Sequence, residues 1–244
     1  MSSFAAIYWR EIILLRHRLG RQLAAAAVTP LLYLLTFGYA LGGHLKVGDH
    51  SYMEFLLPGL IAMAGLTQAF SIASEVNITR FYTGIFEEIQ ASPTHPLAYV
   101  LAEVASGLTR VFLAVAVISL TGWLGGFTLA MGGFFWLAVF LNGFTFSALA
   151  LALALRVRSH ADQGILNSFV ITPMAFLGGT FFPVESLPDW LGYPLRLLPL
   201  TQASRAIRAA CLGEAPSLTP FIALSLTSVI FLLLALQAVG KARD

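Results

Sequence analysis

The sequence predicts an all-α, polytopic membrane protein with six transmembrane helices, on three grounds: its composition, its long apolar segments and the placement of its arginines. The chain has 244 residues, of which 58% are hydrophobic and only 11% are charged. A soluble domain carries about 25% charged residues, so this chain has too few to cover a surface that faces water. We therefore expect residues 1–244 to form a single transmembrane domain.

Six segments reach or approach the roughly 20 apolar residues that cross about 30 Å of hydrocarbon. Helices are expected because a helix satisfies every backbone amide within its own segment, and these segments lack the alternation of barrel strands. The first follows a basic stretch ending at Arg21 and has no clear cleavage site, so we interpret it as a retained span. The expected spans are Leu23–Gly43, Phe55–Ser74, Leu97–Leu124, Phe134–Leu155, Gly164–Phe182 and Leu218–Gly240.

The basic residues in the short flanks of these spans fall mainly on one side of the membrane. Lys and Arg concentrate in cytoplasmic flanks, so both termini are expected in the cytoplasm, and the chain in a bacterial inner membrane. The segment 183–217 is an exception, because it is expected outside and carries three arginines. The residues that set the orientation are Arg10, Arg16, Arg18, Arg21, Arg156, Arg158, Lys241 and Arg243.

Residues 1–21 are predicted to form an amphipathic helix in the plane of the inner membrane surface. Apolar residues recur with a helical period along one stripe, and the arginines occupy the other faces. Trp9 would anchor this helix at the interface. The stripe comprises Phe4, Tyr8, Ile12, Leu15 and Leu19.

Two connecting segments are expected to be structured. The cytoplasmic segment 75–96 fits a short helix at about Arg80–Gln90, ahead of Ser92-Pro93. Pro183, Pro188, Pro194 and Pro199 break the outer segment 183–217 into short pieces, and we expect two helices that re-enter the outer leaflet. Thr201 is expected to cap the second of these, which would end at Gly213.

Several kinds of chemistry are excluded or disfavoured. A phosphate-binding loop ends in Gly-Lys-Ser/Thr, but the only Gly-Lys here, Gly240-Lys241, is followed by Ala242. The five histidines lie outside the expected spans, which disfavours haem ligation and a buried catalytic dyad. The single cysteine, Cys211, excludes an internal disulfide and a multi-cysteine metal site. A net charge of +2 is too small to suggest a nucleic-acid partner, and we expect no metal or cofactor in this chain.

Charged residues are almost absent from the expected spans. Only Glu103 and Arg110 intrude, in the third, and we interpret them as reaching the interface or pairing with neighbouring chains, with a substrate role as the alternative. Without a central ionisable group, coupling to protons or sodium is disfavoured. Polar residues of the spans that could line a path, or else form interhelical hydrogen bonds, include Tyr33, Thr36, Thr67, Gln68, Asn167 and Thr172.

Two stretches resemble signatures of ABC-2-type transporter permeases. The stretch RFYTGIFEEIQASPTHP, residues 80–96, is similar to the cytoplasmic coupling segment of that family, with Arg80, Gly84, Glu87 and Ser92-Pro93 at the matching positions. The stretch 176–208 resembles the second signature, through its Gly-x-x-Phe-Pro, Leu-Pro-x-Trp-Leu and Pro-Leu-Thr elements. The resemblance covers nearly the whole chain, but the short loop between the first two spans leaves no room for a large external domain.

The resemblance implies a membrane lipid environment, a second permease copy, identical or a close paralogue, and two ATPase subunits that hold ATP and magnesium. Family substrates are lipids, lipid-linked glycans, drugs and peptides, mostly exported. A secondary carrier and an integral membrane enzyme are the alternatives. The residues expected to couple to the ATPase are Arg80, Gly84, Ile85, Phe86, Glu87 and Glu88. Those expected at an outer gate are Gly179, Phe182, Pro183, Leu187, Trp190 and Leu191.

Overall fold

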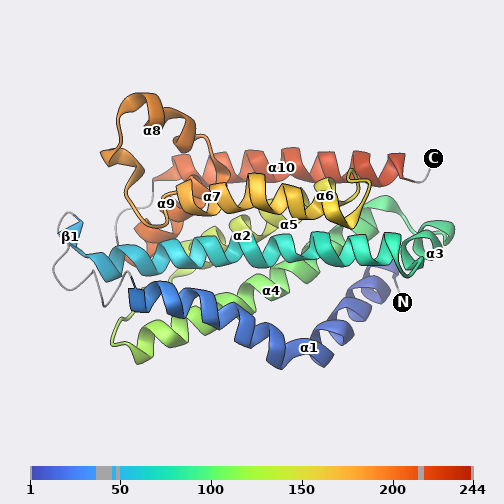
Figure 1. Ribbon diagram of the computed structural model, residues 1–244, viewed down its shortest axis with the longest axis horizontal. Coiled ribbons are helices and arrows are strands. Elements are labelled where there is room, and N and C mark those ends of the chain that lie inside the picture. The colour runs from blue at the N-terminus through green and yellow to red at the C-terminus, as the bar shows by residue number, and fades with distance from the viewer. Residues whose placement is uncertain (1, 37–45, 48–49, 214–216, 243–244) are drawn as a thin grey trace.

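The computed structural model describes residues 2–36, 46–47, 50–213 and 217–242. Figure 1 shows long helices that run along one axis, with both chain ends and α3 at one end and with β1 and α8 at the other. The elements are α1 (Ser3–Tyr33), β1 (Lys46–Val47), β2 (His50–Ser51), α2 (Tyr52–Phe81), α3 (Ile85–Ala91), α4 (Pro96–Leu124), α5 (Gly133–Ala154), α6 (His160–Leu166), the π-helix η2 (Asn167–Ile171), α7 (Thr172–Leu177), the 3₁₀ turn η3 (Val184–Ser186), α8 (Asp189–Arg196), α9 (Pro199–Cys211) and α10 (Leu218–Lys241).

The structure confirms a helical, polytopic membrane protein. Within the described residues, four helices are long and apolar enough to cross a bilayer, namely α2, α4, α5 and α10. They correspond to the second, third, fourth and sixth expected spans. The two-residue strands β1 and β2 form a small antiparallel hairpin, which the all-α prediction did not include.

A capping box fixes the start of α2. The Ser51 amide donates to the Glu54 carboxylate at 2.8 Å, and the Glu54 amide donates to the Ser51 hydroxyl at 3.3 Å. Each bond satisfies a backbone donor that the helix start would otherwise leave free. The central helix of the bundle therefore begins at a defined position beside the hairpin.

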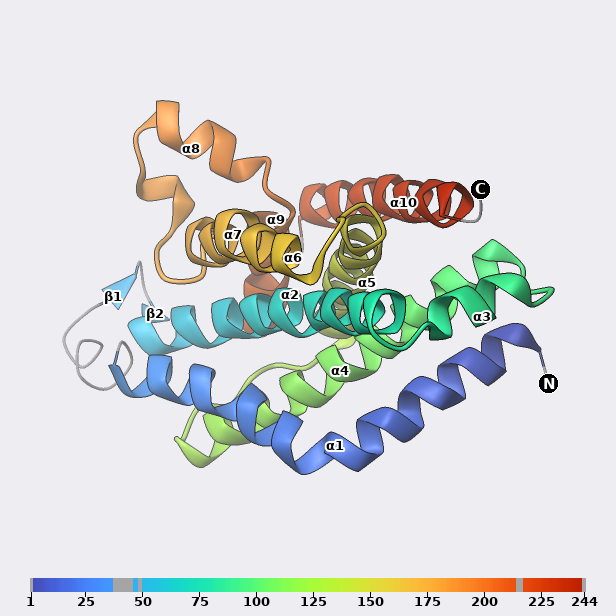
Figure 2. The ribbon, with the colours of Figure 1, turned by 45° about the vertical axis from the view of Figure 1, so that its right-hand side comes forward.

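The interfacial segment and the start of the first expected span form one continuous helix, α1, which bends along its length (Figure 2). Residues 37–43 of the expected span lie outside the described residues. In the first half of α1, the buried side chains are Ile7, Glu11 and Leu15, so the face that packs is rotated from the predicted stripe and contains a carboxylate. Tyr8 donates or accepts a hydrogen bond with Thr109 of α4 at 2.9 Å, which further fastens this half of α1 to the bundle.

The fifth expected span is divided among α6, η2 and α7. Pro173 explains the change of helix type, because its ring cannot donate the backbone hydrogen bond and would clash with the preceding turn of an α-helix. A π-helical turn inserts extra backbone before such a position, and turns of this kind are frequent at functional sites. Figures 1 and 2 both show α6 and α7 running beside α2.

The helices α2, α4 and α5 approach one another closely at small residues. A Cβ atom on Gly107 of α4 would lie 2.2 Å from both the Ile72 and the Ser147 side chains. Gly65 of α2 is similarly close to Asn142, whose amide donates to the Ala62 carbonyl at 3.0 Å. These three helices form a densely packed unit in which glycine is required by the lack of space.

Glu103 and Arg110, the two charged residues of the third expected span, lie inside this chain, 4% and 3% exposed. Arg110 forms a bidentate ion pair with Glu75 of α2 and lies 3.8 Å from Glu11 of α1. The prediction that these residues reach the interface or pair with neighbouring chains is therefore wrong. The sequence near Arg110 could not reveal its ion-pair partners, because Glu75 and Glu11 lie on other helices.

Candidate functional site

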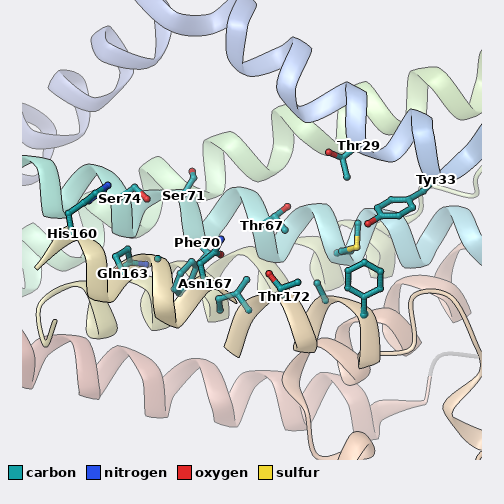
Figure 3. Close-up of a pocket in the computed structure, with 15 residues that line it drawn as sticks. Thr29, Tyr33, Thr67, Phe70, Ser71, Ser74, His160, Gln163, Asn167 and Thr172 are labelled. Atoms are coloured by element: carbon teal, nitrogen blue, oxygen red, sulfur yellow. The ribbon is translucent and has the colours of Figure 1, made fainter. Parts of the chain in front are cut away.

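A cavity of about 570 Å³ lies between the second half of α1, the middle of α2 and the segment α6–η2–α7. Figure 3 shows its labelled side chains pointing into the space from these three elements. The lining residues are Thr29, Tyr33, Met63, Thr67, Phe70, Ser71, Ser74, His160, Gln163, Gly164, Asn167, Ile171, Thr172, Ala175 and Phe176. We call this space the groove.

The groove changes character along its length. At the end nearer α3 it is lined by small hydroxyls, an imidazole and amides, including Ser71, Ser74, His160 and Gln163. Toward the other end the lining is aromatic: the rings of Tyr33 and Phe176 meet edge-on at 6.2 Å, and Phe176 stacks on Phe181 at 5.3 Å. One part of the groove can therefore receive a polar group and the other an apolar one.

Of the six residues predicted to line a path, four come together in the groove: Tyr33, Thr67, Asn167 and Thr172. Gln68 does not; it faces a small separate cavity against α1 and α4 that Arg110 also lines. Thr36 is exposed and does not belong to the lining.

Sequence reasoning missed the hydroxyls of Ser71 and Ser74 in the groove. Together with Thr67 they occupy positions i, i+4 and i+7 of α2, which is one face of a helix. A stripe of small polar residues in an otherwise apolar span was the available signal.

The expected coupling segment forms a sharp turn and a separate short helix. α2 continues to Phe81, and α3 begins only at Ile85, so the predicted helix at Arg80–Gln90 is wrong in its start. Gly84 between them has a φ of 67°, a left-handed conformation that favours glycine. The left-handed backbone conformation is sufficient to explain why residue 84 is a glycine, and no close approach of a partner chain is needed.

Two of the expected coupling residues bind α3 to its own chain. Arg80 donates to the carbonyl of Ala154 at the end of α5 at 2.7 Å, and its guanidinium lies 5.6 Å from the centre of the Phe86 ring. Phe86 is 4% exposed and packs edge-on against Tyr99 of α4 at 5.9 Å. The Phe86 ring is therefore buried within its own chain and does not form an exposed contact for the ATPase.

The exposed part of α3 is acidic. Glu87 and Glu88 are both exposed, while Ile85 is half-buried. Glu87 also borders a cavity of about 580 Å³ that is lined by Arg80, Phe86, Gln90, Ala91 and Ala242 as well. Because Ala242 follows α10, this cavity joins the coupling segment to the C-terminal end of the chain.

The outer segment is attached to the bundle through Arg208 and Gly179. Gly179 makes a turn with φ of 75°. Its carbonyl accepts a hydrogen bond from Arg208 at 2.8 Å, and Arg208 also donates to the Phe55 carbonyl at 3.2 Å and lies 3.7 Å from the centre of the Phe55 ring. The arginine thus ties α9 to the start of α2 rather than lying free at an aqueous rim.

The two outer helices differ in burial. α9 packs against α2 and α5, whereas α8 stands away from the bundle in Figure 2 and exposes Trp190 to 76%. The other expected gate residues, Phe182, Pro183, Leu187 and Leu191, are half-buried. Thr201 does not cap α9, which begins at Pro199; its hydroxyl donates to the Leu195 carbonyl at 2.6 Å and joins α9 to α8.

Comparison with known proteins identifies the family to which this chain is similar. The model of the ABC-2 type transporter family matches residues 2–212. The chain is 30% identical to the inner membrane transport permease YadH of Escherichia coli strain K12, over 99% of this chain and 96% of that protein. It is 26% identical to the daunorubicin resistance ABC transporter permease protein DrrB1 of Streptomyces coeruleorubidus, over 85% and 74% of the two chains. It is 30% identical to nodulation protein J of Rhizobium meliloti, over 76% and 72%.

Proposed function

Since the chain belongs to the ABC-2 type transporter family, we propose that it exports an amphiphilic substrate, either a lipid, a lipid-linked glycan or a drug. It is an inner-membrane permease, and ATP hydrolysis resides in a separate ATPase subunit with which such permeases pair. Two copies of that subunit, which would hold ATP and magnesium, are part of the proposal.

The observation that carries this proposal is the two-part lining of the groove. An amphiphile has a polar head and an apolar body, and the hydroxyl-rich and aromatic parts of the groove match these in turn. Pockets that combine apolar walls with a few convergent polar groups are the usual form of ligand sites. The volume of about 570 Å³ is in the range of such sites, roughly 300–1,000 Å³.

The proposal includes six spans and cytoplasmic termini. The second half of α1 and the segment α6–η2–α7 would supply the two spans beyond α2, α4, α5 and α10. Both run beside long spans in Figure 1, and both chain ends lie with α3 at the same end of the bundle. With α3 facing the cytoplasm, the basic flanks would follow the positive-inside rule, and α8 would lie at the outer surface.

A second permease copy would cover the open side of the groove. The segment α6–η2–α7 carries exposed apolar side chains there, among them Phe169, which is 78% exposed, and Phe176, which is 43% exposed. Two such faces in contact would bury this apolar surface and enclose the groove between identical subunits or close paralogues.

Transport would follow a two-state equilibrium that nucleotide binding biases. Closure of the ATPase pair would move α3, and α2 and α4 would carry this motion because Phe86 and Arg80 join α3 to the packed unit. The groove would then open outward, past the gate formed by the segment from Gly179 to Leu191.

The proposal is tested by reconstituting the permease with its ATPase in liposomes and measuring ATP turnover with lipids and drugs. We expect an amphiphile to raise turnover, and the variants Asn167→Leu and Thr172→Val to weaken that stimulation without reducing the amount of folded complex. Unchanged stimulation in both variants would reject the groove as the path.

The second copy is tested by cysteine crosslinking in a Cys211→Ser background. Phe169→Cys is expected to give a crosslinked dimer, whereas Leu226→Cys on the exposed side of α10 is not. Leu226 is a matched control, since it is also apolar and 61% exposed. Crosslinking at Leu226 but not at Phe169 would place the second copy on another face.

A further inference from the structure

Five charged side chains from three helices meet where the first half of α1 crosses α2 and α4. Arg110 holds Glu75 in a bidentate ion pair and lies 3.8 Å from Glu11, and Arg10 lies 3.5 Å from Glu11 on its other side. Glu103 interacts electrostatically with all four of these residues. We call these five side chains the charge cluster.

The charge cluster contains three carboxyls and only two guanidiniums. Arg110 is engaged by Glu75, and Arg10 by Glu11. Glu103 takes part in none of the ion pairs found among the described residues, although it is only 4% exposed. A buried charge without a partner is strongly unfavourable, and such a group is neutralised instead.

Among the residues that the structure describes, no further cation forms an ion pair with the charge cluster. α1 contributes Tyr8 beside the cluster, and the hydroxyl of Ser71 on α2 accepts a hydrogen bond from Arg110 at 3.3 Å. On α4 the neighbours are the buried Tyr99 and Thr109. Arg80 of α2 interacts with Tyr99 but is occupied by the Ala154 carbonyl at the end of α5. The neighbouring side chains are hydroxyls, which carry no positive charge, so the negative charge of the third carboxylate would remain uncompensated.

We propose that the charge cluster is a proton-binding site, in which Glu11 and Glu103 share one proton that holds the first half of α1 against α2 and α4. Glu75, whose side chain is 23% exposed, is the most exposed of the three carboxyl groups of the cluster. Ser71 links the cluster to the groove, because it accepts from Arg110 and also lines the groove. The cluster therefore lies between the interfacial helix and the candidate substrate path.

The proton makes the attachment of α1 depend on pH in a definite direction. Burial raises the pKa of Glu11, and the neighbouring Glu75 carboxylate raises it further, whereas Arg10 and Arg110 lower it. The attached form then binds more protons than a form in which α1 has moved away. The attachment of α1 is therefore strongest at acidic pH. It weakens as the pH rises from the ordinary pKa of a carboxyl group to the raised pKa of the attached form.

The test measures the distance between α1 and α4 by pulsed electron spin resonance in lipid nanodiscs. Spin labels are attached at Ile13→Cys on the exposed side of α1 and at Leu97→Cys at the start of α4, in a Cys211→Ser background. In the wild-type cluster we expect one narrow distance distribution at acidic and neutral pH and a broader, longer one at alkaline pH. Glu103→Gln, which mimics the protonated acid, should keep the narrow distribution at every pH.

Two further measurements keep the proposal falsifiable if Glu103→Gln fails to fold. Glu11→Gln should flatten the pH dependence in the same way. The infrared band of a protonated carboxylic acid should be present at neutral pH, should be lost in Glu103→Gln or Glu11→Gln, and should persist in Asp189→Asn, a control at an exposed carboxylate. Absence of that band at neutral pH, or identical distance distributions for wild type and variants across the pH range, would overturn the proposal.

Discussion

The two sides of α2 differ in how they meet the rest of the chain. Toward α4 and α5 the helix is packed at glycine and small polar residues, with Gly65 against Asn142 and Ile72 against Gly107. Toward α6–η2–α7 the same helix borders a cavity of about 570 Å³. We refer to these as the tight side and the open side of α2.

The difference teaches which parts can move together. Close-packed interiors transmit displacement because they have little room to deform, so α2, α4 and α5 are expected to move as one unit. The open side meets a segment with a π-helical turn and few tight contacts, which can shift relative to α2. Coupling to the ATPase and passage of substrate would then use opposite sides of one helix.

The largest expected effect is the loss of the buried aromatic ring that attaches α3 to the packed unit of α2, α4 and α5. Phe86→Ala removes a ring that is 4% exposed and packs against Tyr99 of α4, and such changes cost about 3–5 kcal/mol. Thermal unfolding in detergent should occur at clearly lower temperature, and α3 should become susceptible to protease. Phe176→Ala on the open side is the matched control, because that ring is 43% exposed; an equal loss of stability in the two variants would contradict the comparison.

A smaller loss is expected from adding one methyl group on the tight side. Gly107→Ala would place its Cβ 2.2 Å from Ile72 and Ser147, and overpacking of this kind costs about 1–3 kcal/mol. Gly164→Ala in α6 has no heavy atom within 4 Å of the new Cβ, and replacing a helical glycine with alanine stabilises by about 0.5–1 kcal/mol. Unfolding temperatures should therefore shift in opposite directions, and a drop in both would show that the open side is packed as well.

Substitutions at two adjacent residues of α2 test the two sides through substrate binding rather than through stability. Thr67 lines the groove, and Gln68 faces the small cavity against α1 and α4. Thr67→Val removes a hydroxyl that could bind substrate, and a hydrogen bond contributes about 0.5–1.5 kcal/mol, so the substrate concentration for half-maximal ATPase stimulation should rise about two- to tenfold. Gln68→Leu should leave it unchanged, and the reverse outcome would move the path to the other side of α2.

The long apolar runs allowed most of the membrane helices to be predicted. α4, α5 and α10 begin and end within one residue of the expected spans, because their bounds follow the apolar composition directly. α2 extends to Phe81, seven residues beyond the expected Ser74, since a helix can continue past the hydrocarbon and polarity marks only the membrane edge. The division of the fifth span by Pro173 also depends on how its neighbours leave space for a π turn.

The candidate site was predictable only in part. Thr67, Asn167 and Thr172 are polar residues in apolar runs, which is a local signal. The ion-pair partners of Arg110 are not local, because Glu75 and Glu11 reach it from two other helices. Phe86 was expected to contact the ATPase, yet its ring is buried against Tyr99 in the next helix, which the local sequence does not indicate.

The smallest expected effect concerns the charge that α3 presents to the ATPase. The contrast within α3 repeats that within α2, since Phe86 points to the packed unit while Glu87 is exposed and borders the cavity beside Ala242. Glu87→Lys should weaken the association of permease and ATPase, mainly by slowing it, because rim charges act on encounter rates. A single exposed pair contributes only about 0.2–1 kcal/mol, so the affinity should fall about fivefold or less.

The loss of affinity should be greater at low ionic strength, where charges are less screened. It should be smaller for Glu88→Lys, because Glu88 does not border that cavity. Surface plasmon resonance at two salt concentrations measures both variants. Equal affinity for wild type and Glu87→Lys at low salt would remove this residue from the contact and leave α3 coupled through its packed side alone.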